Sequence, residues 1–467
     1  MSMMKLTLMS VSLPRRPEVR ASEGKMKMKV GFVLTAVALV GLAATPRLSA
    51  DVIIDWNNVL LDTIRTNSLG PQPSTRIIAS MNTAMYDAVN SVTRTHQPYH
   101  VNMTADPGTS REAAAAQAAY RVLSGLVPAS QAKYDAALST SLSGVTDGPG
   151  KSAGIALGNT VGAAILTLRA NDGASAVVPY TPGSDPGDWR PTPPANAPAL
   201  LPQWATMTPW AMTSPSQFRN PNGPPALDSA EYTAAFNEVK AIGSATSATR
   251  TPDQSNIARF WVSPAGTSTA PGHWIRIAET VAEFKGNTLE ENARMFALIG
   301  IAQADATISC WDNKYLYDHW RPVTAIRAAE TDGNPDTSAD PNWSSFITTP
   351  NHPSYLSNHS AVSGASGAVL ADFFGTDNIS FMSSSEGLIV PDRTFDSFSQ
   401  ASAEAASSRL YAGIHWRYDN EDGLAGGRAL GHYVTATQLR SIPEPPSLAL
   451  LTLALFVILR HRKYPRL

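Results

Sequence analysis

Apolar residues recur at three- and four-residue spacing through most of the chain between residues 51 and 442, a pattern typical of amphipathic helices. The segments that carry this pattern are Val52–Thr66, Arg76–Val92, Arg111–Leu126, Ser152–Ala170, Ser229–Ile242, Glu291–Ser309, Trp311–Ala329, Ala361–Phe374, Gln400–Tyr411 and Asp422–Leu439. The sequence shows no convincing strand alternation. Pro- and Gly-rich stretches at Pro179–Pro225, Pro264–His273 and Asp332–Tyr355 are longer than the connections of a minimal bundle. The sequence therefore predicts an all-α protein with long connecting loops.

The charge pattern and the cysteine content exclude several classes of protein. Of the 467 residues, 43% are hydrophobic and 16% are charged, which is a globular rather than a disordered composition. Residues 51–442 hold 24 Lys and Arg against 35 Asp and Glu, a net charge of about −11 that argues against a nucleic-acid partner. The single cysteine, Cys310, rules out an intramolecular disulfide and a thiolate zinc cluster.

The sequence predicts a targeting signal at each end of the chain. Lys25, Lys27 and Lys29 precede the apolar run Val30–Ala44, and Leu48-Ser49-Ala50 forms a small-residue cleavage site, so residues 1–50 are predicted to be a leader and signal peptide. Within residues 443–467, the tripeptide Pro443-Glu444-Pro445 is followed by an apolar run and a basic end. This order resembles the PEP-CTERM sorting signal of Gram-negative bacteria, and an ordinary tail anchor is the alternative. Either interpretation predicts export to the periplasm, the outer surface or the extracellular matrix, with transient membrane contact through this segment.

Three short segments in the second half carry unusual combinations of charge. On a continuous helix, Lys314 and Arg321 would lie within about 20° of each other, so two cations are predicted to share one face. Pro322 would kink or end that helix. The alternative is a solvated basic face in which Asp318 is an intrahelical partner.

The second and third segments each place a histidine beside a polar group. Ser357 is a predicted N-cap for the helix that follows it, and His359 would lie beside the exposed amides as a proton donor. His415 and Asp419 are four residues apart, so the carboxylate can orient one nitrogen of the imidazole. Taken singly, each of these features has an ordinary explanation as a helix cap or a surface contact.

Taken together, the three segments resemble the signature of the vanadium haloperoxidase and type 2 phosphatidic acid phosphatase superfamily: Lys-x6-Arg-Pro, then Pro-Ser-Gly-His, then Ser-Arg-x5-His-x3-Asp. The first and third patterns match at every fixed position. In the second, Leu356 replaces the proline and Asn358 replaces the glycine, while Ser357 and His359 remain. The resemblance implies a pair of four-helix bundles, which we place at residues 51–210 and, with the site, at residues 211–442.

The resemblance also implies a role for each matched residue. Lys314, Arg321 and Arg409 would neutralise the oxygens of a bound vanadate or phosphate, and Ser357 and the Asn358 amide would add hydrogen bonds.

His415 would be the ligand of vanadate or, equally, the nucleophile toward phosphate. Asp419 would orient it, His359 would be the general acid and base, and Lys314 would also polarise bound peroxide.

Flanking residues favour a peroxidase over a phosphatase. Trp311 resembles a tryptophan near the halide region of haloperoxidases, and His352 stands where algal bromoperoxidases have a histidine and chloroperoxidases of this family have an aromatic residue. The alternative for His352 is a solvent-exposed loop residue. We expect an exported haloperoxidase that uses vanadate and hydrogen peroxide to oxidise halide, bromide rather than chloride. Two alternatives stay open: a secreted acid phosphatase that acts on phosphomonoesters through a phosphohistidine, and a non-catalytic cell-surface or matrix protein whose degenerate site Asn358 would explain. Oligomer formation is left open.

Overall fold

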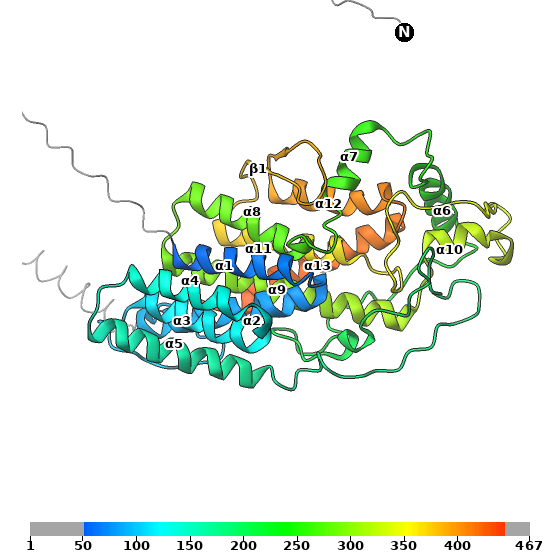
Figure 1. Cartoon of the computed structure of the whole chain (residues 1–467). Helices are drawn as coiled ribbons and strands as arrows, with labels where there is room; N and C mark the ends of the chain where they lie inside the picture. The colour runs from blue at the N-terminus through cyan, green and yellow to red at the C-terminus, as the bar shows by residue number, and fades with distance from the viewer. Residues whose placement is uncertain (1–50, 444–467) are drawn as a thin grey trace, which may run out of the picture. The chain divides into compact units, whose positions relative to one another are not determined.

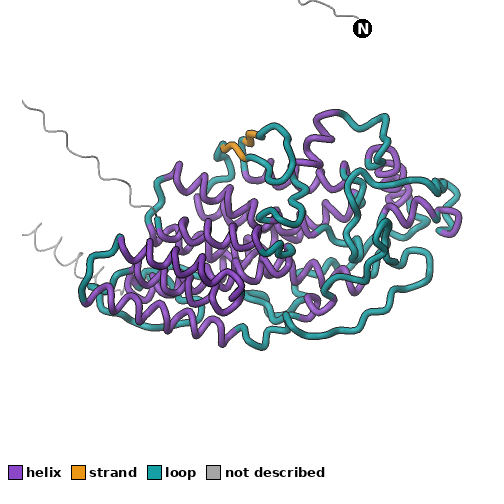
Figure 2. The backbone as a smooth tube through the Cα atoms, in the orientation of Figure 1, coloured by secondary structure: helices purple, strands orange, loops and turns teal. Residues whose placement is uncertain are grey.

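The computed structural model describes residues 51–443, and most of this part of the chain is helical (Figures 1 and 2). The α-helices are α1 Val52–Thr66, α2 Pro71–Thr93, α3 Arg111–Leu126, α4 Gln131–Ser143, α5 Pro149–Leu168, α6 Ala230–Ile242, α7 Pro252–Phe260, α8 Thr269–Lys285, α9 Leu289–Tyr317, α10 Pro322–Arg327, α11 Asn358–Phe374, α12 Phe398–Tyr411 and α13 Arg417–Thr437. Short 3₁₀ turns are η1 Pro128–Ser130, η2 Pro202–Thr206 and η3 Ala329–Thr331. The prediction of an all-α protein is confirmed, and one small antiparallel ribbon, β1 Phe381–Ser383 with β2 Arg393–Phe395, adds to it.

Helix starts follow the capping residues of the sequence. Asp51, Ser110 and Ser357 each accept a hydrogen bond from a backbone amide in the first turn of the helix that they precede. Helices α1 and α3 begin and end at the predicted residues, and the prediction that Ser357 is an N-cap is confirmed.

The central helix α9 differs from its prediction. Instead of two helices that meet near residue 310, one helix of 29 residues runs from Leu289 to Tyr317, opened by a capping box in which Thr288 and Glu291 bond reciprocally. It ends at Asp318, which adopts a left-handed conformation at φ 47°. Arg321 therefore does not share a helical face with Lys314, because it is the N-cap residue of the next helix, α10.

Three helices were not predicted. Helix α8 begins inside a stretch that we interpreted as a linker, since Pro271 and Gly272 occupy its first turn, where a proline is tolerated. Helix α7 also opens on a proline, and α4 buries only Tyr134, so its apolar periodicity is weak.

Helices α11 and α13 lie side by side near the middle of the molecule and pack closely (Figure 1). A Cβ atom on Gly427 of α13 would lie 2.1 Å from the carbonyl oxygen of Ala361 of α11, so only a glycine allows this approach. Gly300 likewise allows α9 to approach α2 closely, because a Cβ atom there would lie 2.9 Å from the Cα atom of Ala79. The N-terminal ends of α11 and α13 are thus held in a fixed relation, and both ends carry predicted site residues.

Two groups of predictions stay untested. The leader (residues 1–50) and residues 444–467 of the sorting segment lie outside the described residues, and the boundary at 210/211 between two bundles stays a prediction. Between residues 51 and 443, no helix has the length and apolar character needed to span a bilayer.

Candidate active site

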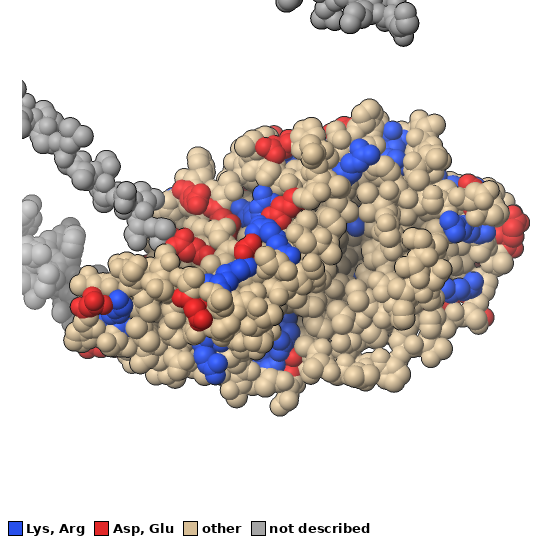
Figure 3. Space-filling view, in the orientation of Figure 1, with Lys and Arg blue, Asp and Glu red and all other residues tan. Residues whose placement is uncertain are grey.

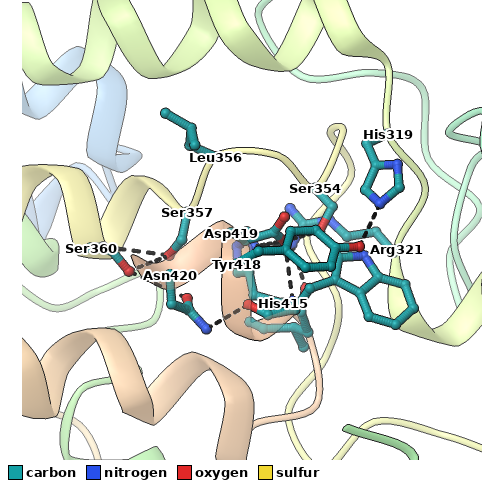
Figure 4. Close-up of polar contacts among 12 residues, drawn as sticks. His319, Arg321, Ser354, Leu356, Ser357, Ser360, His415, Tyr418, Asp419 and Asn420 are labelled. Carbon is teal, nitrogen blue, oxygen red and sulfur yellow. Dashed lines mark hydrogen bonds and ion pairs between the residues drawn. The ribbon is translucent and has the colours of Figure 1, made fainter. Parts of the chain in front are cut away.

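Side chains from four stretches of the chain meet beside the N-terminal ends of α11 and α13 (Figure 4). The C-terminal part of α9 and the connection after it supply Trp311, Lys314 and Arg321; the loop before α11 and its first turn supply His352, Ser354, Ser357, Asn358 and His359; α12 and the turn after it supply Arg409 and His415; the first turn of α13 supplies Asp419. The three predicted segments, about a hundred residues apart at their extremes, are therefore brought to one place.

His415 is held by Asp419. The Nδ1–H of His415, which precedes α13, donates to Asp419 Oδ2 over 2.8 Å, as the spacing of the two residues predicted. The same oxygen accepts the backbone amide of Trp416 at 3.2 Å and the hydroxyl of Ser354. This set of bonds fixes the tautomer of His415, so that the proton is on Nδ1 and Nε2 carries the lone pair.

Arg321 forms hydrogen bonds with both His415 and His352. It is fully buried, and its Nη1 donates to His415 Nε2 at 3.0 Å while its Nη2 donates to His352 Nδ1 at 2.9 Å. Its Nε and Nη1 also reach the carbonyls of His352 and Ile414. Burial lowers the pKa of Arg321 to about 10, which still leaves it charged at neutral pH.

Lys314 lies beneath the loop that precedes α11. Its ammonium is fully buried and donates to the carbonyls of Pro353 at 2.9 Å, Ser354 at 2.8 Å and Leu356. All three hydrogens of the ammonium are therefore used to hold the loop, and contact with an oxyanion requires the exchange of at least one of them. Burial lowers the pKa of Lys314 below its ordinary value.

Arg409 is buried without a full set of partners. Only 3% of it is exposed, yet its Nε and Nη1 atoms have no hydrogen-bond partner among residues 51–443. Burial, together with the charge of Arg321, lowers the pKa of Arg409 to about 9. An unpaired buried guanidinium is costly unless an anion completes its contacts.

The polar atoms of three residues at the start of α11, Ser357, Asn358 and His359, differ in whether they have hydrogen-bond partners. Ser357 Oγ accepts hydrogen bonds from the amide and the hydroxyl of Ser360, and the Ser357 amide donates to the Asp419 carbonyl at 3.0 Å. The atoms Asn358 Oδ1 and His359 Nε2 are buried and have no partner in the described part of the chain. Burial and the charge of Arg409 hold the pKa of His359 well below its usual range, so this ring is neutral.

Trp311 and His352 form one wall of the site. Their rings lie 5.0 Å apart, and Lys314 Nζ is 5.8 Å from the Trp311 ring. His352 is only 6% exposed, so the alternative of a solvent-exposed loop residue is wrong. Asp318, which we considered as an intrahelical partner of the cations, instead accepts a hydrogen bond from Tyr180.

Positive charge is concentrated inside the protein at this place. Burial and the charges of Arg321, Lys314 and Arg409 together hold the pKa of His415 well below its usual range, and burial raises the pKa of Asp419. On the surface, by contrast, acidic and basic residues are interspersed around a hollow near the middle of the displayed face (Figure 3). The unpartnered donors of Arg409 and the excess of buried cations fit a small, multiply charged oxyanion such as vanadate or phosphate.

Sequence reasoning missed four contributors. Ser354 bonds Asp419, Ser360 bonds Ser357, and Asn420 Oδ1 faces Ser360 at 3.3 Å. The long segment between α5 and α6 also reaches the site, because the Leu200 carbonyl accepts hydrogen bonds from Trp311 Nε1 at 3.3 Å and from the Tyr315 hydroxyl. The adjacent serines were visible in the sequence, but nothing in their spacing signalled these contacts.

The chain is similar in sequence to known proteins. The family model of the second helical-bundle domain of VCPO matches residues 294–443. Vanadium chloroperoxidase of Curvularia inaequalis is 29% identical over 261 residues, which cover 42% of this chain and 42% of that protein, so the alignment spans less than half of this curated relative.

Solved structures show the same likeness. The crystal structure of a bacterial vanadium-dependent iodoperoxidase superposes with a TM-score of 0.74 at 29% identity and covers 84% of this chain and 98% of that one. An apo-type bacterial vanadium-dependent chloroperoxidase superposes with a TM-score of 0.64 at 18% identity, covering 79% of this chain and 94% of the other, which shows a shared fold. In its helical fold and in the convergence of the three signature segments, the chain is similar to proteins of the vanadium haloperoxidase superfamily.

Proposed function

We propose that the chain is an exported vanadium-dependent haloperoxidase that uses hydrogen peroxide to oxidise halide to hypohalous acid. The observation that carries the proposal is the unpaired, buried guanidinium of Arg409 beside Arg321 and the Asp419-bound His415. This set supplies positive charge, hydrogen-bond donors and one oriented imidazole nitrogen, which are the groups that a histidine-bound vanadate needs. Bound vanadate would supply the Lewis acid that activates hydrogen peroxide toward attack by halide.

The contacts of each residue in the site indicate the role that it would have in this reaction. Arg321 and Arg409 hold negative charge, and Lys314 joins them when it releases a loop carbonyl. Asp419 keeps the hydrogen of His415 on Nδ1, so Nε2 would hold the oxyanion in exchange for its contact with Arg321 Nη1. His359, with an unpartnered Nε2, would serve as the general acid and base beside the bound oxyanion, whose negative charge would offset the burial that keeps the ring neutral in this structure.

For the halide, we propose bromide rather than chloride. The wall of the site presents an imidazole, His352, against Trp311, and a polar wall suits a halide that is easily oxidised. Iodide, which is oxidised more easily still, is the halide named for the bacterial iodoperoxidase that shares 29% identity with this chain.

Export and sorting are part of the same proposal. A chain cleaved after Ala50 would begin at Asp51, whose carboxylate caps α1. The tail segment would be removed or retained at the membrane during sorting.

To test this proposal, two reactions are measured on the same protein preparation. Purified protein is incubated with and without orthovanadate, and peroxide-dependent bromination and phosphomonoester hydrolysis are then measured beside the variant His415→Ala. Bromination that needs vanadate and is lost in the variant supports the proposal. Hydrolysis without vanadate favours the acid phosphatase, and two silent assays favour the non-catalytic alternative.

A further inference from the structure

Ser360 lies one turn inside α11, behind Ser357, and no role was assigned to it from the sequence. It is fully buried, and its hydroxyl donates to Ser357 Oγ over 2.9 Å (Figure 4). Its backbone amide points at the same oxygen over 3.4 Å. Ser357 Oγ therefore accepts two hydrogen bonds from one residue.

These two bonds determine where the hydrogen of the Ser357 hydroxyl can go. A hydroxyl oxygen has one hydrogen and two lone pairs, and Ser360 occupies both lone pairs of Ser357. Among residues 51–443, no acceptor receives the hydrogen of Ser357. The hydrogen is left for a group that enters the site, and an unprotonated oxygen of an oxyanion can accept it.

Asn420 stands on the other side of Ser360. Its amide nitrogen donates to the Trp416 carbonyl at 2.9 Å, which turns its oxygen toward the Ser360 hydroxyl at 3.3 Å. The single hydrogen of Ser360 thus has two acceptors, and the shorter contact is the one to Ser357. Asn420 is a weaker competitor that keeps the Ser360 side chain in place.

We propose that Ser360 is a positioning residue that orients the Ser357 hydroxyl as a hydrogen-bond donor toward the oxyanion. The inference rests on the proposed oxyanion site and goes beyond it, because it assigns the donor character of Ser357 to a neighbour on the same helix. Without the Ser360 hydroxyl, only the Ser360 amide still bonds Ser357 Oγ, so the hydroxyl hydrogen has more than one open direction and points to the anion for only part of the time.

The variant Ser360→Ala isolates the hydroxyl. It keeps the Cβ atom that packs near Gly423 of α13, and alanine is favourable within a helix, so the fold is retained. The matched control is Ser363→Ala, one turn further along α11. Ser363 is equally buried, but its hydroxyl accepts from Trp274 Nε1 at 2.9 Å and faces no site residue.

The experiment is a double-mutant cycle with orthovanadate affinity, measured by titration calorimetry on the purified full chain, as the readout. Inorganic phosphate is titrated in parallel, and the unfolding free energy of each variant is measured without anion. We expect Ser360→Ala to weaken vanadate binding on the order of 3- to 10-fold and Ser357→Ala on the order of 10-fold or more. In the Ser357→Ala background, Ser360→Ala should change the affinity by less than about twofold, because the two residues act through one hydroxyl. Ser363→Ala should lower the unfolding free energy and leave the affinity unchanged.

The other outcomes separate the inference from the proposed function. If the wild-type protein binds vanadate and Ser360→Ala binds it equally well, or if its effect persists without Ser357, the positioning role is wrong and the proposed function stands. If the wild-type protein binds neither vanadate nor phosphate, both are wrong.

Discussion

Replacement of Arg409 by methionine should make the empty protein more stable while it abolishes oxyanion binding. The expectation follows from the unpartnered Nε and Nη1 atoms of a guanidinium that is 3% exposed. A buried cation without a counter-charge destabilises the folded state, and an apolar side chain of similar length removes that cost. The same substitution removes donors that only an anion can satisfy.

The size of the effect can be worked out from the environment of the charge. Burial lowers the pKa of Arg409 from 12.5 to about 9, and one pKa unit corresponds to about 1.4 kcal/mol, so the site disfavours the charged form by up to roughly 5 kcal/mol. Replacement of buried ionic groups by apolar ones stabilises proteins by about 1–4 kcal/mol. We therefore expect Arg409→Met to raise the unfolding free energy by about 1–3 kcal/mol.

The assay is urea denaturation with and without orthovanadate. At a concentration of 100 times the dissociation constant, vanadate should stabilise the wild-type protein by about 2.7 kcal/mol and leave Arg409→Met unchanged. The matched control is Arg169→Met, because Arg169 is also 3% exposed but pairs with Asp172 at 3.1 Å. That variant should lose about 1–3 kcal/mol, since Asp172 keeps its ion pair with Arg76 but loses the one with Arg169. An Arg409→Met protein that is less stable than wild type, or that vanadate still stabilises, would refute the reasoning.

Three further predictions concern the neighbouring groups. Asp419→Ala should weaken vanadate binding on the order of 10- to 100-fold, as expected for a residue that orients the ligand His415, and calorimetry that shows a larger loss than His415→Ala would reverse the two roles. His352→Phe should shift the pH profile of bromination and alter the ratio of bromide to chloride oxidation; identical profiles and ratios would remove His352 from the site. Glu386 binds Arg65 Nη2 at 2.5 Å and has a pKa lowered to about 2, so its contribution to stability is present above pH 4.5 and is lost as the pH falls toward 2. Glu386→Gln should cost about 1–2 kcal/mol at pH 7 and remove that pH dependence, and acid denaturation curves that coincide with those of wild type would contradict this.

The helices that could be predicted from the sequence are those whose signals are local. Helices α1 and α3 start after an Asp or Ser cap and carry regular apolar spacing, so both ends were predictable. The end of α9 was not, because it depends on Asp318 in a left-handed conformation, whereas Pro322, the obvious stop signal, opens the next helix. The start of α8 was hidden by a proline in its first turn.

In the candidate site, too, features with a local sequence signal were predictable and features that depend on tertiary structure were not. Signature spacing identified the residues that converge, since the pattern of their types is written in the sequence. Their contacts were not predictable where they depend on tertiary structure. Lys314 was expected to face an oxyanion, and it holds the carbonyls of Pro353, Ser354 and Leu356 instead. The bond from Ser354 to Asp419 joins residues 65 positions apart, and no local pattern signals it.

The segment between α5 and α6 is anchored through the backbone carbonyl of Leu200, so its side chains are less restricted than those of the helices. Trp311 and Tyr315 bind that segment through its main chain, so the bonds do not depend on which side chains the segment carries. Substitutions of its side chains can therefore leave these two hydrogen bonds in place. Substitutions in this segment are expected to change what lies beside Trp311 and Tyr315 without disturbing the bundle. A library randomised at residues 196–203 is therefore the natural starting point for laboratory selection of altered substrate preference.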